Sequence, residues 1–379
     1  MITELFLIMQ RFYLGISLFL LFFAGSCKKN NTSLSYDTFD LLPTVSLEEV
    51  FEPVTFIPLQ SNDSSIISNI LKICMSEDSF YILSVNPFKI SKFDRAGNFI
   101  SNIAREGRAE GEYLVVSDIY YNDSDNMLYI DDAFKGIIKY KADGSYDSTI
   151  PLKTKNRQSV VSDSGSIIIN NLNMLGNEQY SLIEMTSEKD TLFSASNHCI
   201  FDCENVFYIP AHPSFKLNNN GLLFNPACND TIYSYSTGKL TPRYIIDFPH
   251  PVTTRELKDF NKYMIDTQFI MDYSEDDKNL YLTIFDRDWD YKQYLMRKHS
   301  GEIHRAHYRI SEDFNTEFSP RWQYGDMLID VFDPATLNYT YHKDITPEDS
   351  QKAFAFFKNH GIPGIKEDSN PIIMLTKAK

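Results

Sequence analysis

The chain has 379 residues, of which 43% are hydrophobic and 23% are charged, and its formal net charge is −15 at pH 7. This composition is typical of a folded globular protein, and the length exceeds what one compact core usually fills, so a repeat architecture or two domains is expected. The acidic surplus argues against nucleic acid as a partner, because surfaces that bind phosphate need concentrated Lys and Arg.

The N-terminus predicts an export signal. An apolar run from Phe12 to Ala24 is too short to span a bilayer, which needs about 20 residues, but it fits the hydrophobic region of a secretory signal. The run ends in Ala-Gly-Ser-Cys27, which resembles a bacterial lipobox, where the cysteine is lipidated and becomes the new N-terminus. We predict a lipoprotein signal peptide at 1–26, lipid attachment at Cys27 and a flexible tether at 27–46. A chance cysteine after an ordinary signal peptide is the alternative.

Two stretches of the chain repeat one pattern. Phe80–Leu83 leads into Lys92–Phe99, and Leu128–Asp131 leads into Lys139–Tyr146 in the same way, 48 and 47 residues later. A period of this size, written in strands and Gly turns, is typical of a β-propeller blade. Such a repeat predicts the architecture and leaves the chemistry open.

Strand-like segments rich in Tyr, Phe and β-branched residues continue this pattern along the chain. After an opening strand at Phe51–Leu59, the expected blades lie at 66–103, 115–152, 166–194, 221–248, 268–310 and 327–376. We therefore predict an all-β fold, a six-bladed β-propeller over 47–379; seven blades is the alternative.

Two short helical insertions are expected among the strands. Thr253–Glu256 has the pattern of a capping box at a helix start. Thr346–Asp349 places a proline at the first helical position and an acid at the third, and Gly361 supplies a stop. We expect both helices to pack on the edge of the propeller; a lid over the central channel is the alternative.

The remaining cysteines could pair in an oxidising compartment, and their four positions allow three pairings between which the sequence does not choose: Cys74, Cys199, Cys203 and Cys228. No Cys-x-x-Cys motif is present. The chain also has no His-Glu-x-x-His, Gly-x-Ser-x-Gly or Walker motif. We therefore predict no metal site, no cofactor and no catalytic residue.

Several segments carry a family likeness: Phe56–Leu59, Ala104–Tyr113, Asn229–Tyr233, Pro242–Phe248 and Glu367–Leu375. Together they resemble the six-bladed β-propeller lipoproteins of Bacteroidota, which are related to NHL-repeat proteins. The resemblance covers about residues 50 to 379. It implies a propeller fold and a location in the cell envelope, and it implies no activity, because that family has no agreed one.

The crossing between the first two blades departs from the pattern of this family, which is Gly-Arg-x-Gly-x-Gly-Pro-Gly-Glu-Tyr. The chain has Ala104, Ala109 and Glu110 where the family has Gly, Gly and Pro. Since glycines there allow tight backbone geometry, the replacements predict a relaxed turn. Arg105 and Glu106 in this crossing are candidate ligand-binding residues by position, because propellers expose such loops at their central opening.

The sharpest local feature is the acidic segment that begins at Asp286. On a strand, alternation would put Asp286, Asp288 and Asp290 on one face, where three carboxylates could hold Ca²⁺ or a cationic ligand. The alternative is a hairpin tip whose acids are merely solvated. An exposed Trp289 on such a tip could stack on a sugar or contact a partner.

These observations predict a non-catalytic, envelope-anchored propeller that binds or scaffolds a protein, peptide or glycan. A lyase or hydrolase acting on glycan or peptide through the central channel is the alternative, and a structural subunit of an uptake complex is a third option. The lipid at Cys27 would contact the membrane, expected to be the bacterial outer membrane; the sequence leaves open which face of it carries the protein.

Overall fold

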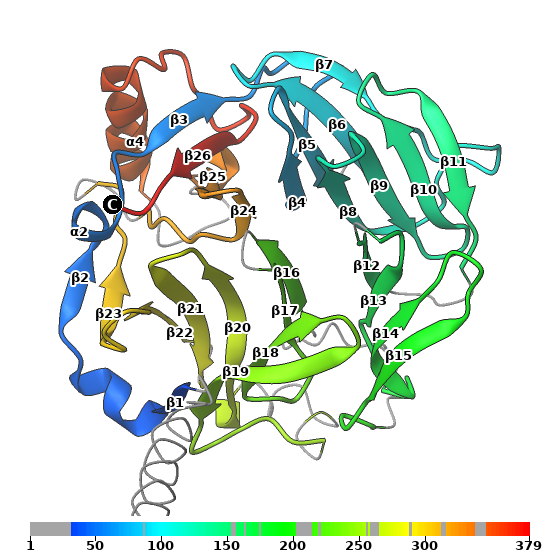
Figure 1. Ribbon diagram of the computed structural model, residues 1–379. Coiled ribbons are helices and arrows are strands. Elements are labelled where there is room, and N and C mark those ends of the chain that lie inside the picture. The colour runs from blue at the N-terminus through cyan, green and yellow to red at the C-terminus, as the bar shows by residue number, and fades with distance from the viewer. Residues whose placement is uncertain are drawn as a thin grey trace, which may run out of the picture. The chain divides into compact units, whose positions relative to one another are not determined.

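Six sheets follow one another around a common centre, as Figure 1 shows. The computed structural model describes residues 32–85, 88–152, 157–162, 164–173, 176–201, 214–218, 221–254, 257, 265–287, 290–311, 316–337 and 346–379. Residues Ser33–Lys379 form one compact unit. The predicted six-bladed β-propeller is confirmed.

Each blade runs from an innermost strand to an outermost one. Blades 1 and 2 contain β4 (Ile70–Met75), β5 (Ser79–Ser84), β6 (Lys89–Asp94), β7 (Phe99–Asn102), β8 (Val116–Asn122), β9 (Met127–Asp132), β10 (Gly136–Lys141) and β11 (Tyr146–Ile150). Blades 3 and 4 contain β12 (Arg157–Val161), β13 (Ile167–Asn171), β14 (Tyr180–Met185), β15 (Thr191–Ser196), β16 (Ser214–Asn218), β17 (Gly221–Asn225), β18 (Thr231–Ser236) and β19 (Lys239–Asp247). Blades 5 and 6 contain β20 (Gln268–Glu275), β21 (Asn279–Asp286), β22 (Tyr291–Arg297), β23 (Ile303–His307), β24 (Trp322–Tyr324), β25 (Met327–Phe332) and β26 (Ile372–Thr376).

The ring is closed by the strand that the sequence identified as the opening one. β3 (Thr55–Pro58) pairs antiparallel with β26 as the outermost strand of blade 6, with Phe56 opposite Met374. The last blade therefore combines strands from both ends of the propeller sequence (Figure 1). This pairing removes the two ends that an open ring of sheets would leave.

The residues just before β3 fold onto blades 4 and 5. β1 (Thr32–Ser35) adds a fifth strand beside β19, η1 (Tyr36–Leu41) follows, and β2 (Thr44–Ser46) pairs in parallel with β23 before the short helix α2 (Leu47–Val50). The expected tether at 27–46 therefore differs from the structure over its described part. The reason is burial, because the side chains of Leu34, Tyr36 and Phe39 are 7%, 5% and 1% exposed.

The core lies between the blades. An apolar cluster fills each of the six interfaces, for example Ile90 with Ile119 between blades 1 and 2, and Leu295 with Met374 between blades 5 and 6. Middle strands face a neighbouring blade on both sides, and all residues of β5, β13 and β26 are accordingly buried. Outermost strands such as β7 and β15 alternate with exposed positions.

The repeated motif of blades 1 and 2 forms equivalent turns between their third and fourth strands. Gly97 and Gly144 have φ of +88° and +86°, a conformation that glycine adopts at little cost. A Cβ at Gly97 would lie 2.2 Å from the carbonyl oxygen of Pro58 in β3. The repeat therefore encodes both a turn and the approach of the neighbouring blade.

One of the two predicted helices is confirmed. α4 (Pro347–Asn359) begins with a capping box between Thr346 and Asp349, and Gly361 follows it with φ +80°. α4 and the 3₁₀ helix η3 (Pro334–Leu337) lie between β25 and β26, with Phe357 buried. Most of the helix expected after Thr253 lies outside the described residues.

The inner strands were the least visible in the sequence. β12, β16 and β24 were not among the expected segments, because they are short and carry charged or polar residues between apolar ones. In the part of the chain that the structure describes, no helix is long and apolar enough to cross a membrane.

Candidate functional site

Among the residues that the structure describes, hollows lie between blades at three places that bear on binding. The largest, which we call the groove, has a volume of about 1080 Å³ and is bordered by blades 5, 6 and 1. The channel cavity has about 240 Å³ and is lined from the inner edge of every blade, by Ile73, Tyr120, Ser159, Phe215, Ser274 and Trp322 among others. A side pocket of about 250 Å³ lies between blades 4 and 5.

The groove and the channel cavity lie toward opposite faces of the propeller. Because every blade starts at its inner edge, the inner strands run in one direction and their first residues meet at one face. The groove takes residues from the starts of β4 and β20, including Leu71 and Met271. The channel cavity takes residues near the strand ends, including Met75 and Tyr324.

A β-bulge interrupts the inner strand at the same place in blades 1, 2 and 5. The registers skip one residue between Ile70 and Lys72, between Val116 and Asp118, and between Ile270 and Asp272. The additional residues are Leu71, Ser117 and Met271. A bulge bends the strand and redirects a side chain. Leu71 and Met271 are accordingly 52% and 48% exposed, and both line the groove.

The residue after each bulge is charged: Lys72, Asp118 and Asp272. Together with Lys216 and Arg321, these residues form what we call the charge ring. Lys72 Nζ lies 3.5 Å from Asp118 Oδ1, and Lys216 Nζ lies 2.7 Å from Asp272 Oδ1. Lys216 Nζ also donates to the carbonyl oxygen of Arg321 at 2.7 Å. Arg321 Nε in turn lies 2.7 Å from Asp330 Oδ1. The ring thus links charged groups of five blades into matched pairs.

A buried ion pair joins blades 2 and 3. Arg157 Nε lies 3.1 Å from Asp131 Oδ1, and the two side chains are 0% and 4% exposed. Ser159 donates to Asp131 from its backbone nitrogen and its hydroxyl. Burial raises the pKa of Asp131 to about 6, while Arg157 and Ser159 act in the opposite direction. The arginine and the serine therefore stabilise the charged form of this carboxylate against the effect of burial.

The far mouth of the channel carries one contact between blades 2 and 6. The hydroxyl of Tyr324 donates to Asp123 Oδ1 at 3.1 Å. Burial, together with this hydrogen bond, raises the pKa of Tyr324 to about 12. Cys74 lines the same cavity as a thiol whose pKa is raised by burial. The Tyr324 hydroxyl and the Cys74 thiol are therefore neutral at pH 7, which suits a structural wall.

The groove differs because it has carboxylates in excess. Asp290, Glu317 and Asp333 line it, and none of the three forms an ion pair with another described residue. Its arginine, Arg321, is already engaged with Asp330. Tyr291 adds an aromatic side chain that is 59% exposed. The groove therefore combines surplus negative charge with exposed apolar surface.

Gln293 lies on the groove side of β22 and is 7% exposed. Its Oε1 receives no hydrogen bond from the residues that the structure describes. Buried polar atoms usually have a partner, since leaving one unsatisfied costs about 1–3 kcal/mol. This oxygen is itself buried, and Gln293 also lines a small internal hollow beside Tyr308, so the acceptors that the groove exposes are its carboxylates.

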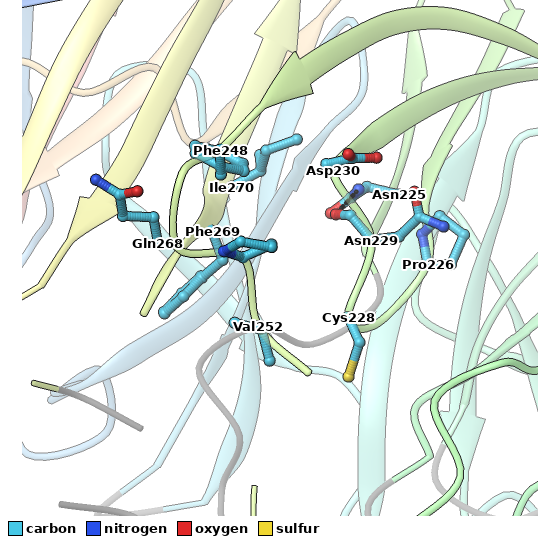
Figure 2. Close-up of a pocket in the computed structure, with 11 residues that line it drawn as sticks. Asn225, Pro226, Cys228, Asn229, Asp230, Phe248, Val252, Gln268, Phe269 and Ile270 are labelled. Atoms are coloured by element: carbon cyan, nitrogen blue, oxygen red, sulfur yellow. Dashed lines mark hydrogen bonds between the residues drawn. The ribbon is translucent and has the colours of Figure 1, made fainter. Parts of the chain in front are cut away.

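The side pocket has one apolar and one polar wall, as Figure 2 shows. The polar wall is the turn between β17 and β18, where Asn225 Nδ2 donates to the carbonyl oxygen of Asn229 at 3.1 Å. A disulfide between Cys199 and Cys228 ties this turn to the end of blade 3. It is one of the pairings that the sequence left open, and Cys203 lies outside the described residues. The polar groups here serve the turn itself.

The predicted acidic segment is divided by the structure. Asp286, the last residue of β21, pairs with Lys292 and accepts from Gln268 Nε2 at 2.6 Å. Burial acts to raise the pKa of Asp286, but these donors outweigh it and lower the pKa below its ordinary value. The chain then turns at Arg287, whose φ is +54°, so strand alternation ends there. Asp290 lines the groove.

Asp288 and Trp289, the other members of that segment, lie outside the described residues. The structure therefore brings one of the predicted acids, Asp290, to the groove and engages another, Asp286, in an ion pair beside it. In the described chain, no group of three or more His, Cys, Asp or Glu is placed to hold a metal ion.

The crossing between blades 1 and 2 has a structural explanation. Arg105 Nε lies 2.6 Å from Glu112 Oε1, and the backbone of Glu106 forms a bridge with Tyr113. Hydrogen bonds from Ala109 and Arg105 lower the pKa of Glu112. Neither Arg105 nor Glu106 lines any of the three hollows described above. The expected relaxed turn is wrong at Ala104, which keeps a left-handed φ of +60° without being glycine.

Sequence reasoning missed most of the groove. Leu71 and Met271 belong to strands that alternation assigns correctly, but a bulge reverses their direction, and one sequence does not reveal a bulge. Glu317 and Asp333 lie in connections of blade 6 that carry no motif. The available signal was Asp290 and Tyr291 at a hairpin tip.

Comparisons with known proteins agree with the fold. A family model described as "Domain of unknown function (DUF4934)" matches residues 34–377. A solved structure of a protein from Bacteroides fragilis NCTC 9343, described as exported, has a TM-score of 0.68 and 16% identity, and the match covers 92% of this chain and 99% of that chain. A DUF4221 family member from Bacteroides vulgatus ATCC 8482 has a TM-score of 0.53 and 10% identity, covering 88% and 99% of the two chains. A comparison with curated proteins found no match.

Proposed function

The chain belongs to the DUF4934 family, and we propose that it is an extracytoplasmic binding module, anchored to the cell envelope by a lipid on Cys27, that captures a protein, peptide or glycan partner without transforming it. The anchor is proposed from the lipobox-like sequence before Cys27. The resemblance to envelope propeller lipoproteins and the exported description of the Bacteroides fragilis structure support the same location.

The observation that carries the proposal is the groove. Soluble proteins seldom expose several large apolar side chains beside one another without a use for them. Here Leu71, Met271 and Tyr291 are each about half exposed around one hollow of about 1080 Å³. That volume is at the upper end of small-molecule sites, so the groove suits a ligand with several residues or sugar units.

The inner wall supports binding in preference to catalysis. A general acid or base must be within hydrogen-bond reach of the substrate, so that it can transfer a proton to or from it. The cationic groups Lys72, Lys216 and Arg321 are instead held by Asp118, Asp272 and Asp330. No histidine is among the lining residues of the described channel cavity. Each charge already has a structural partner.

Site-specific photocrosslinking tests the groove as the binding surface. A photoreactive amino acid placed at Leu71, which is 52% exposed, is expected to capture a partner in intact envelopes. The same photoreactive amino acid placed at Leu192, which is 56% exposed on the outer strand of blade 3, is the matched control. Equal adducts from both positions, or none from Leu71, would reject the groove.

Metabolic lipid labelling tests the anchor separately. The wild-type chain should incorporate a labelled fatty acid and partition into detergent, and Cys27→Ala should do neither. Cys74→Ala is the control, because it removes another thiol and leaves the signal sequence intact. Unchanged labelling of Cys27→Ala would contradict the anchor and leave the crosslinking result standing.

A further inference from the structure

The groove has a chemistry that selects one class of occupant. We propose that it binds a basic, extended protein segment in which Lys or Arg side chains stand beside aliphatic or aromatic ones. This inference rests on the proposed function and specifies the partner of the same groove. Three properties of the groove carry it: its surplus charge, its apolar side chains and its set of hydrogen-bond acceptors.

The surplus charge favours a cation. Asp272 and Asp330 are matched by Lys216 and Arg321, which leaves Asp290, Glu317 and Asp333 without an ion-pair partner among the described residues. A ligand that covers these carboxylates removes them from water, and burying an uncompensated charge is costly. A neutral sugar does not supply the opposite charge, whereas an ammonium or guanidinium group does. An acidic glycan would add repulsion.

The apolar side chains favour a segment that also carries hydrophobic groups. Leu71 and Met271 come from different blades, and the bulges at these two positions turn both side chains toward the groove. Tyr291 is exposed next to Asp290 at the start of β22. A simple polyamine would neutralise the acids but leave these side chains in water. A peptide with alternating basic and apolar residues covers both.

The polar groups point to a ligand that donates hydrogen bonds. The three carboxylates Asp290, Glu317 and Asp333 accept hydrogen bonds and donate none when they are ionised. Lys and Arg side chains have donors and no acceptor, so they match this set. The groove also extends from Asn69 in blade 1 to Asp290 in blade 5, which suits an extended chain.

The test pans a phage-displayed random dodecapeptide library against the purified propeller with its signal sequence removed. The retained peptides are expected to be enriched in Lys and Arg next to Leu, Phe or Tyr. A synthetic consensus peptide is then measured by fluorescence anisotropy against the wild type and the groove variant Asp290→Asn/Glu317→Gln. The control variant Glu52→Gln/Asp78→Asn removes the same charge from two exposed acids outside the groove.

Three results are expected together. The groove variant should raise the Kd for the consensus peptide at least fivefold, and the control variant should change this Kd less than twofold. Added salt should raise the Kd of the wild-type complex. Replacing Lys and Arg of the peptide by Gln should have the same effect as the groove variant.

The inference would be overturned if the retained peptides were neutral or acidic, or if the groove variant and the control variant lost the same affinity for the consensus peptide. So would failure to retain any peptide that distinguishes the groove variant from the wild type. A panel of neutral hexasaccharides (cellohexaose, maltohexaose, chitohexaose) separates the two proposals. Sugar binding that the groove variant abolishes would leave the binding module standing and reject the basic segment, whereas crosslinks absent from Leu71 would reject both.

Discussion

Two neighbouring regions of the propeller use the same residue types in opposite ways. In the charge ring, Lys72, Lys216 and Arg321 each have a carboxylate partner, and the contacts join one blade to the next or hold a strand in place. In the groove, Asp290 and Glu317 line the hollow without such a partner among the described residues. The two regions adjoin, and Asp272 and Arg321 of the charge ring also line the groove.

The bulges of β4 and β20 lie where the two regions meet. Leu71 lines the groove and the next residue, Lys72, belongs to the charge ring. Met271 also lines the groove, and the next residue, Asp272, lines it too while pairing with Lys216 of the charge ring. The difference teaches that matched charge in this protein joins neighbouring blades, while the surplus charge and exposed apolar groups lie in the groove for which we propose a partner. Substitutions in the two regions should therefore separate stability from binding.

The largest effect is expected at the buried ion pair between blades 2 and 3. Arg157→Met leaves the Asp131 carboxylate, 4% exposed, without its cation and should lower the free energy of unfolding by about 3–5 kcal/mol. Urea unfolding measures this loss. The double variant Arg157→Met/Asp131→Leu should recover most of it, because an apolar pair of similar volume replaces a charged one. A loss below about 1 kcal/mol would show that the pair is not what holds blades 2 and 3.

A smaller effect is expected in the charge ring. Lys72→Met removes the cation beside Asp118, whose side chain is 10% exposed, and should cost about 1–3 kcal/mol. Lys72→Arg keeps the charge and should stay close to the wild type. If both variants unfold like the wild type, the ring is not structural and its contrast with the groove is lost.

The ion pair beside the groove predicts a dependence on pH. Because the folded-state pKa of Asp286 is lowered, its contribution to stability is present above its unfolded value and is lost as pH falls through the folded value. Lys292→Met should therefore cost about 0.5–1 kcal/mol at neutral pH and less at about pH 3. Urea unfolding at both pH values gives the difference in free energy of unfolding between Lys292→Met and the wild type. Lys352→Met, which removes an exposed ion pair on α4, serves as control. A difference between Lys292→Met and the wild type that does not change with pH would contradict the role given to the Asp286–Lys292 pair.

The smallest effect on stability is expected in the groove itself. Asp290→Asn/Glu317→Gln should unfold within about 0.5 kcal/mol of the wild type, because neither carboxylate has a structural ion pair among the described residues. Thermal and urea unfolding measure this. A loss above about 1 kcal/mol would show that these acids stabilise the fold and would remove the distinction between the two regions.

The sequence by itself determined the architecture. The repeat at 80–99 and 128–146 predicted blades, their third-to-fourth-strand turns and about six copies, because a blade needs a fixed period of strands and turns to fold. The α4 helix was likewise predictable, since the capping box and the stop at Gly361 are local signals. Both depend on residues close together in the chain.

Tertiary structure alone decided the candidate site. The partner of Lys72 lies on blade 2, the partner of Lys216 lies on blade 5, and the groove takes its residues from three blades. The sequence of one blade cannot show which residue of another it will meet. Strand alternation also does not reveal the bulges that turn Leu71 and Met271 toward the groove, because a bulge depends on how each inner strand pairs with its neighbour. The period of the chain fixes the blades, and the packing of the blades fixes which charges are matched and which remain for a partner.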